Sequence, residues 1–441
     1  MKTVIKFITR AFLIGLLLFI PQLAGAGEEK AAVTAEKSSE AASGRKVLSV
    51  PYAFYNDGFN FAAGYVYGIM GYPQKQSAIL TTFVVGTNGS AMMFFVGKDL
   101  QVPFMPRLFV DPNFSFGKFK ELRAFVQGNP SYEDQIAGSN GSSKDNFIEG
   151  DGWDNYFRPR FKYLLPIGHG KDSLINNYVT DGGLLRSGAS GGTSWNPLVS
   201  GKTYLECKPF YRKQEIDSQF VNYIKRTNGF EFSLFRDNTD YSPNPSKGTA
   251  LRVRFTGDWG WFDSSNPWKV MDAELSKYFS LGETERFRQR VLAFTVWTAD
   301  CLTWNDSHTS HGTTKLHRPP SFAGATLGGL WRMRAFPSAR YYDKSAIYYS
   351  AEYRMIPRWN PLAEISLIQK YLELSWWQVV PFVEVGRVAP TWQMNRLHSN
   401  MQWDAGLGVR AMAKGLVIRV DTAASEEGVG IQMMISQPFQ F

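Results

Sequence analysis

The 441-residue chain has little cysteine and, past its N-terminus, no long apolar run. Two thiols, Cys207 and Cys301, give no disulfide framework. They fall four candidate strands apart, about 19 Å around a barrel wall at roughly 4.8 Å per strand, so we expect them not to pair. After residue 26 no stretch of about 18 apolar residues occurs, which excludes a membrane-spanning helix from the mature chain.

A basic cluster with interleaved aromatics is also missing, although the formal net charge is +9. Three of the cations lie in the first ten residues, which leaves +6 for the rest. Nucleic-acid binding needs a concentrated basic surface, so we expect no nucleic-acid partner. We also expect no enzyme activity, no cofactor and no metal.

The N-terminus has the pattern of a secretory signal. Three cations precede an apolar stretch at 11–20, and a small-residue cleavage site ends at Ala26. Residues 27–46 are small and charged and contain no aromatic residue, so they predict a disordered periplasmic leader. The remaining residues, 47–441, form the single predicted domain.

Apolar and polar residues alternate with period two through the last forty residues. From 428 to 441 one face carries Val429, Ile431, Met433, Ile435, Phe439 and Phe441. In the two preceding runs Arg410, Arg419 and Asp421 fall on the opposite face. Charged residues are costly in a water-free core, so a lipid-facing barrel with a wet lumen satisfies both faces. The alternative is a soluble antiparallel sheet with one wet face.

The predicted fold is therefore all-β, a transmembrane antiparallel β-barrel of sixteen strands. The composition agrees, since 44% hydrophobic and 15% aromatic residues coexist with a mean hydropathy of −0.24. The candidate strands are 58–71, 77–86, 90–98, 104–113, 118–127, 156–166, 203–214, 229–237, 249–260, 268–279, 288–301, 345–356, 377–388, 401–412, 415–424 and 428–441. Segment 362–374 is either a short helix or an extra strand.

Strand parity predicts which connections are external. With both termini periplasmic, the long polar connections 128–155, 302–344 and 389–400 lie outside, and the short turns 280–287 and 412–415 lie inside. Two long connections, 167–202 and 357–376, also come out periplasmic. Because periplasmic turns are usually short, this predicts one misplaced early or middle strand.

Four segments in the second half resemble motifs of the BamA/TamA superfamily of outer-membrane assembly factors, also called bacterial surface antigen. Residues 327–336 resemble its loop signature "GG…(V/L)RG(F/Y)", and 236–248 resemble its "DR…P..G" turn. Glu352 and Arg354 stand in an "EYR" motif, and Phe382, Glu384 and Gly386 in an "FxDxG" motif. The loop residues of the match are Gly328, Gly329, Met333, Arg334, Ala335 and Phe336.

The resemblance implies that the loop folds back into the lumen, where Arg334 pairs with Glu384. A guanidinium offers a bidentate fork to a carboxylate, and a confined lumen strengthens the pair. Two residues depart from the family pattern: Ala335 replaces a glycine, and Glu384 replaces an aspartate. Because alanine takes positive φ with difficulty, we expect a relaxed loop tip.

The resemblance also implies a location and partners. The location is the bacterial outer membrane, and the expected state is a monomeric barrel surrounded by outer-membrane lipids. Family members that handle proteins carry periplasmic POTRA domains, for which the residues before the first strand are too few. We therefore expect either a separate periplasmic subunit that delivers client proteins or another use of the barrel.

Three functions remain open at this point. The first is membrane-protein assembly or protein translocation through a seam between the first and last strands, where Gly428 and Gly430 would weaken and kink the pairing. In the same family the terminal Phe441 resembles an insertion signal. The second function is a passive pore, and the third is an outer-membrane phospholipase.

Two motifs are weaker. Residues 188–192 match the G-x-S-x-G pattern around Ser190, but no strand-to-helix turn is predicted there. His308, His311 and His317 cluster in the external loop, with a spacing that fits no closed structural zinc site. We expect neither a nucleophile nor a bound metal.

Overall fold

The computed structural model describes residues 45–56, 58–304, 309–310, 313–314 and 317–435. The predicted signal peptide, nearly all of the leader, His308, His311, Phe439 and Phe441 therefore lie outside the described residues.

A single antiparallel sheet contains nineteen strand segments. In the first half they are β1 (Lys46–Asn56), β2 (Asn60–Met70), β3 (Ala78–Gly86), β4 (Ala91–Lys98), β5 (Leu100–Val102), β6 (Met105–Asp111), β7 (Asn113–Ala124), β8 (Ile148–Phe157) and β9 (Arg160–Leu164). In the second half they are β12 (Lys202–Ser218), β13 (Asn222–Thr239), β14 (Gly248–Asp258), β15 (Trp268–Ser280), β16 (Phe287–Cys301), β21 (Ser345–Pro357), β22 (Leu374–Ala389), β23 (Gln402–Ala413), β24 (Leu416–Ser425) and β25 (Gly428–Ile435).

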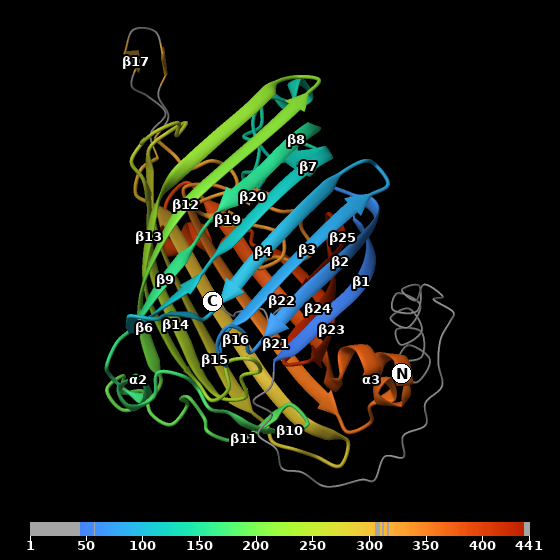
Figure 1. Ribbon diagram of the computed structural model, residues 1–441. Coiled ribbons are helices and arrows are strands. Elements are labelled where there is room, and N and C mark those ends of the chain that lie inside the picture. The colour runs from blue at the N-terminus through green and yellow to red at the C-terminus, as the bar shows by residue number, and fades with distance from the viewer. Residues whose placement is uncertain (1–44, 57, 305–308, 311–312, 315–316, 436–441) are drawn as a thin grey trace.

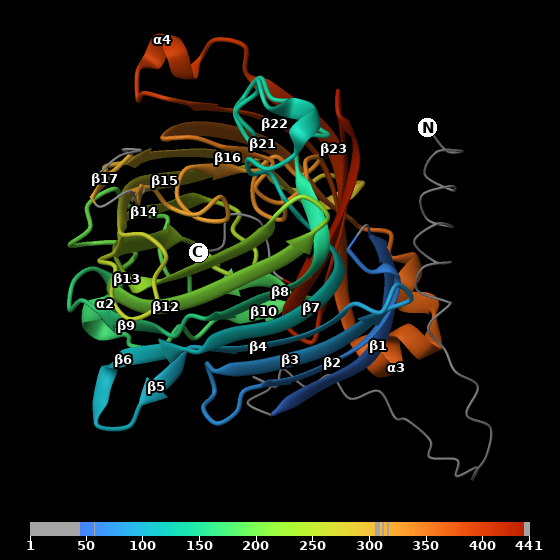
Figure 2. The ribbon, with the colours of Figure 1, turned by 90° about the horizontal axis from the view of Figure 1, so that it is seen from above.

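Three of these segments continue the one before. β5 follows β4 across Asp99, β7 follows β6 across Pro112, and β9 follows β8 across 158–159. The described part of the chain therefore contributes sixteen strand passes to the sheet, the number that the sequence predicts. The strands are tilted side by side (Figure 1) and curl into a ring when seen from above (Figure 2).

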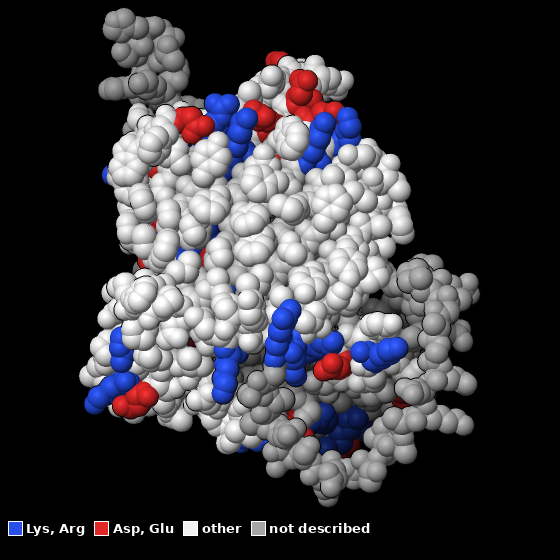
Figure 3. All heavy atoms as spheres, viewed as in Figure 1, with Lys and Arg blue, Asp and Glu red and all other residues white. Residues whose placement is uncertain are grey.

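The outward face of the sheet is apolar. Exposed large side chains alternate along the strands, among them Phe83, Phe116, Phe232, Leu251 and Val296. Figure 3 shows a broad uncharged band across the middle of one side, with Lys, Arg, Asp and Glu gathered above and below it. A band of this kind matches the lipid-facing belt of membrane barrels.

The inward face differs from one part of the ring to another. On β21–β24 it carries buried charges, including Glu352, Glu384, Asp404, Arg410 and Asp421. On β1–β4 it is apolar and forms two hydrophobic clusters, whose members include Leu48, Val50, Phe54, Val66, Leu80, Val84, Met92, Phe94 and Val96.

The N-terminal strand predictions need correction. The structure has a strand β1 that the sequence reading missed, and the candidates 104–113 and 118–127 are β6 and β7, which run on as one pass. These two errors cancel, so every later candidate keeps its ordinal number. Pro51 lies in the middle of β1. Proline cannot donate a ladder hydrogen bond, so it is tolerated in a strand at the edge of a sheet, where that donor is not needed.

The suspected strand error is thus present in the early part of the chain, but it does not explain the two long lower connections, which the structure retains. Residues 165–201 contain α2 (His169–Asp172), β10 (Val179–Asp181) and β11 (Leu184–Ser187), and 358–373 contain η2 (Pro361–Glu364) and α3 (Ser366–Leu372). Both lie at the lower end of the ring (Figure 1). The helical alternative for 362–374 is the correct one.

Smaller elements complete the description. They are η1 (Pro130–Tyr132), α4 (Met394–Leu397), β17 (Thr309–Ser310), β18 (Thr313–Thr314), β19 (Thr326–Leu327) and β20 (Tyr341–Tyr342). Within the described ranges, no helix is both long and apolar enough to span a membrane. Cys207 and Cys301 are free thiols.

Candidate functional site

The loop between β16 and β21 folds back into the ring. β19 and β20 pair with one another inside it, and the motif residues Met333, Arg334 and Phe336 are at most 1% exposed. Leu327 and Met333 pack over Gly386 of β22, where an added Cβ would lie 2.9 Å from Leu327 Cδ1 and 3.3 Å from Met333 Sδ. The motif glycine on the strand therefore leaves room for the loop.

The loop tip is a tight turn stabilised by its own backbone. The Phe336 N–H donates to the Met333 carbonyl at 3.0 Å, and the Gly329 N–H donates to the Phe336 carbonyl at 3.0 Å. Gly328 and Gly329 have φ of 109° and 102°, and Met333 has φ of 56°. Ala335 is absent from the positive-φ residues of the described chain, so the turn closes without a left-handed conformation at Ala335. The left-handed residue is Met333.

Arg334 reaches three carboxylates from three different strands. Its Nε lies 3.2 Å from Glu384 Oε1 on β22, and its Nη1 lies 3.0 Å from Glu352 Oε1 on β21. The same Nη1 lies 2.7 Å from Asp421 Oδ2 on β24. The guanidinium also covers the Phe382 ring, with Cζ 3.5 Å from the ring centroid. The predicted partners Arg334 and Glu384 therefore meet, within a larger set than the motifs imply.

The backbone of the tip is bound as well. The Arg334 N–H donates to Glu384 Oε2 at 2.7 Å, and the Ala335 N–H donates to Asp404 Oδ2 at 3.1 Å. The Tyr348 hydroxyl donates to the remaining oxygen of Glu384. Such backbone bonds to carboxylates fix the position of the tip as well as its charge.

Further arginines surround the carboxylates. Glu352 accepts from Arg354 Nε at 2.8 Å and Arg410 Nη2 at 2.7 Å, and Asp421 lies 2.6 Å from Arg419 Nη1. The cluster, called the loop-anchoring cluster below, holds four arginines and four carboxylates: Arg334, Arg354, Arg410, Arg419, Glu352, Glu384, Asp404 and Asp421. All eight are at most 2% exposed. Direct pairing of the arginines with Glu352, Glu384 and Asp421 makes burial tolerable, because an unpaired buried charge is strongly unfavourable.

The last described strand also contacts the loop tip. Gln432 Nε2 donates to the Arg334 carbonyl at 3.2 Å. Gly430 faces inward, and an added Cβ would lie 2.6 Å from that same oxygen. Gly430 thus permits the close approach of loop and strand, a role different from the seam kink that the sequence suggested. Gly428 has φ of 147° and no neighbour within 4 Å of an added Cβ.

Two more arginines tie the loop to the wall. Arg332 Nη2 lies 2.7 Å from Glu274 Oε2 on β15. Arg340, fully buried, lies 2.6 Å from Glu427 Oε1 in the β24–β25 turn and donates to the Ser142 carbonyl at 2.6 Å. The loop therefore holds the C-terminal strands and an upper loop together.

No described residue pairs the two edge strands of the sheet, β1 and β25, with each other. In the described residues β1 pairs only with β2, and β25 only with β24. A cavity of about 2920 Å³ is lined by consecutive residues of both edge strands, 48–55 of β1 and 431–435 of β25. Because consecutive residues point to opposite faces of a strand, the cavity passes between the edges. It connects the lumen with the outward side of β23 and β24, where Val409 and Val420 line it.

At its lower end, the seam between β1 and β25 is bridged by a hydrogen bond and by helix α3. Lys414 Nζ, in the β23–β24 turn, donates to the Val47 carbonyl of β1 at 2.8 Å. Leu372 of α3 packs with Leu48 and Leu416 in one hydrophobic cluster. Figures 1 and 2 place α3 beside β1, and Figure 1 also shows it next to β23.

The Ser190 hydroxyl bonds a tyrosine and backbone carbonyls rather than the His169 side chain. The Ser190 hydroxyl lies 2.8 Å from the Tyr178 hydroxyl and donates to the Thr239 carbonyl, while His169 Nδ1 lies 2.9 Å from the Ser190 backbone carbonyl. The segment packs on the β13–β14 turn, where Gly191 touches Asn238. His317 belongs to no group of three or more potential metal ligands among the described residues.

Sequence reasoning missed part of the loop-anchoring cluster. Arg410, Arg419 and Asp421 were recognised as charges on the inward faces of their strands. Nothing in their local sequence placed them beside Arg334, which comes from about eighty residues earlier. The available signal was the alternation of inward and outward residues along each strand, which places all three on the same inward face as Asp404.

No family model matches the chain, and no curated protein is similar to it in sequence. Solved structures are similar in fold. CdiB from Escherichia coli has a TM-score of 0.51 at 11% identity, over 89% of this chain and 59% of that one. BamA from Haemophilus ducreyi lacking POTRA domains 1–3 and CdiB from Acinetobacter baumannii have TM-scores of 0.46, at 10% and 11% identity. Each match covers 89% of this chain, with 69% and 59% of the other chain respectively.

Proposed function

We propose that the chain is an outer-membrane β-barrel that assists membrane-protein assembly or protein translocation through the seam between β1 and β25. The single observation that carries the proposal is that β1 and β25 are unpaired with each other over the described residues 46–56 and 428–435 and line one cavity that reaches from the lumen to the outward face. An edge with free N–H and C=O groups is a template on which a client strand can pair.

Three further features support this reading. The uncharged outward band fits a lipid environment. The fold is similar to that of CdiB from Escherichia coli. The buried loop keeps the C-terminal wall in place, so that opening requires movement of the β1 edge only. We propose that Arg334 and Glu384 act as a lock on that loop.

The alternative is a passive pore in which the same cavity conducts small solutes. The size of the cavity favours a pore. Its volume of about 2920 Å³ exceeds the roughly 300–1,000 Å³ of a pocket that encloses one small molecule. The two functions differ in their need for the seam, since a pore conducts whether or not the edges separate.

A reversible cross-link across the seam tests the choice. Ser49 of β1 and Met433 of β25 both line the seam cavity. In a background with Cys207→Ser and Cys301→Ala, the pair Ser49→Cys and Met433→Cys is joined by a reducible bismaleimide. Reconstituted in liposomes, the protein should accelerate folding of a small eight-stranded outer-membrane barrel, measured by heat-modifiable gel migration. The cross-link should abolish the acceleration, and reduction should restore it.

A matched control joins two strands that are already paired. Ser49→Cys and Tyr67→Cys stand directly opposite each other in the β1–β2 register, so their cross-link leaves the seam free and should not change the rate. Acceleration that survives the seam cross-link would refute the lateral route. Steady large conductance with no acceleration at all would favour the pore.

A further inference from the structure

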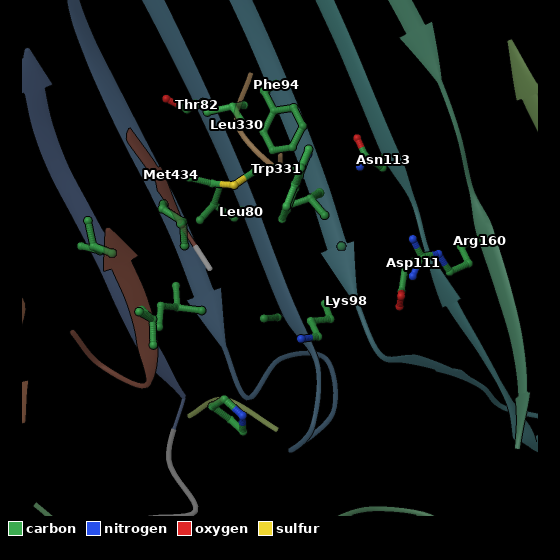
Figure 4. Close-up of a pocket in the computed structure, with 18 of the residues that line it drawn as sticks. Leu80, Thr82, Phe94, Lys98, Asp111, Asn113, Arg160, Leu330, Trp331 and Met434 are labelled. Atoms are coloured by element: carbon green, nitrogen blue, oxygen red, sulfur yellow. The ribbon is translucent and has the colours of Figure 1, made fainter. Parts of the chain in front are cut away.

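The inner wall of β1–β4 is unusual for a wet lumen because it is apolar. Leu80, Phe94 and Met434 line the cavity together with Leu330 and Trp331 of the loop, as Figure 4 shows. These side chains come from β3, β4, β25 and the inward-folded loop. The apolar stretch therefore begins at the seam and extends into the lumen.

A cationic wall begins two strands further round the ring. Val96 of β4 stands opposite Asn113 of β7, and the Asn113 carbonyl accepts from the Arg158 N–H at 2.7 Å. At roughly 4.8 Å between neighbouring strands, the backbone at Arg158 is about 10 Å from the backbone at Val96. Figure 4 shows Lys98 and Arg160 in the same cavity as Phe94.

The charges that line this cavity do not balance. Twelve cationic and seven anionic side chains are among the described residues that line it, in contrast to the equal numbers in the loop-anchoring cluster. Arg158 has no carboxylate partner within the described chain, and its guanidinium lies 3.9 Å from the Tyr156 ring centroid. Arg160 has only a distant partner, Glu206 at 3.9 Å, which Arg252 approaches to 3.2 Å.

We propose that this cavity binds an anionic amphiphile, with its acyl chain along the apolar wall and its carboxylate or phosphate head at Arg158 and Arg160. The apolar wall excludes a purely polar anion as the best occupant, because it offers no hydrogen bonds. The cationic excess disfavours a neutral hydrocarbon, because guanidinium groups are satisfied by oxyanions. The inference uses the open seam of the proposed function as the entry from the lipid phase.

Photolabelling in a bilayer tests the site. The full-length protein in phosphatidylcholine nanodiscs is labelled with a sixteen-carbon fatty acid that carries a diazirine, and labelled peptides are mapped by mass spectrometry. The methyl ester of the same probe serves as the neutral control. The acid should label β3, β4 and 330–331 saturably, whereas the ester should label mainly outward-facing peptides.

Arg158→Ala should reduce inner-wall labelling by the acid about tenfold, the loss expected for a hydrogen-bonded charge, and leave outward labelling unchanged. Arg186→Ala is the matched control, because Arg186 forms an exposed pair with Asp181 and is not among the described residues that line the cavity. Phe94→Ser should reduce inner labelling, whereas Phe94→Leu should preserve it. Heat-modifiable migration verifies that each variant is folded.

Three results would overturn the proposal. They are labelling confined to outward faces, equal inner labelling by acid and ester with no effect of Arg158→Ala, and displacement by inorganic phosphate as effective as by unlabelled fatty acid. The last would make the site a simple anion site. No client protein is used, so failure here is separate from failure of the assembly assay.

Discussion

The inward faces of β21–β24 and of β1–β4 form opposite kinds of wall on the two sides of one seam. The first is charged, fully buried and covered by the inward-folded loop, with carboxylates from three strands on Arg334 alone. The second is apolar and open to a large cavity. Strand pairing holds both walls, and the first is also tied to the inward-folded loop by ion pairs.

The difference assigns different mechanical roles to the two edges. Residues of β25 and its turn contact the loop through Gly430, Gln432 and Glu427. Among the described residues, β1 is linked across the seam by the Lys414 bond and by the hydrophobic cluster of Leu48, which also contains Leu372, Leu416 and Ile435. We therefore infer that β25 is the fixed edge and β1 the moving one.

The largest expected effect is at the centre of the charged wall. Glu352 lies within 3.0 Å of Arg334, Arg354 and Arg410, so Glu352→Gln leaves buried guanidinium charge uncompensated. We expect a loss of about 3–5 kcal/mol in unfolding free energy, measured by urea unfolding in lipid vesicles. Glu283→Gln removes an exposed partner of Arg358 and should cost at most about 1 kcal/mol. Equal losses would show that the charged wall is not special.

Removing the cation from the loop should have a somewhat smaller effect. Arg334→Ala loses the three carboxylates but lets the loop relax, so we expect about 3 kcal/mol of destabilisation and a change in conductance or heat-modifiable migration. Arg334→Ala combined with Glu352→Gln restores equal charge numbers in the cluster. The double variant should lose less than the sum of the two single losses, and strict additivity would contradict the coupling of loop and wall.

Every strand of the charged wall was predicted, whereas β1 of the apolar wall was missed. Candidates 345–356, 401–412 and 415–424 differ from β21, β23 and β24 by at most one residue at each end, because charged inward and apolar outward residues alternate clearly there. In β1 the inward Leu48 and Val50 are as apolar as the outward Val47, so the alternation disappears. In β8 the glycines at 150 and 152 weaken the strand pattern.

The site was predictable only in part for a related reason. A motif links Arg334 to Glu384, and strand parity places Arg410 and Asp421 on the inward face. Their convergence depends on how deeply the loop enters the lumen, which is a long-range packing property. Likewise, the turn geometry places the left-handed conformation at Met333 and not at Ala335. The identity of residue 335 alone did not reveal this.

A smaller effect should follow from disturbing the fixed edge. Gly430→Ala places a Cβ about 2.6 Å from the Arg334 carbonyl, so either the loop tip or β25 must move. We expect a cost of about 1–3 kcal/mol, typical of overpacking, in the same urea assay. Gly141→Ala meets no atom within 4 Å and should leave stability unchanged. A neutral Gly430→Ala would mean that the loop does not fix this edge.

The smallest effect on stability should come from the moving edge. Lys414 has φ of 49° and bonds the Val47 carbonyl, so Lys414→Asn keeps a residue that tolerates the left-handed conformation while removing the bond across the seam. The free energy of unfolding should fall by no more than about 1 kcal/mol.

In contrast, the β1 edge should separate from β25 more often in the Lys414→Asn protein. Faster maleimide labelling of Leu48→Cys, in a background lacking the native thiols, would reveal this. Arg186→Ala in the same background is the control for a surface cation. If labelling is unchanged while the Glu352→Gln protein labels faster, then the charged wall, and not the lower end of β1, governs the seam, and the assignment of fixed and moving edges must be reversed.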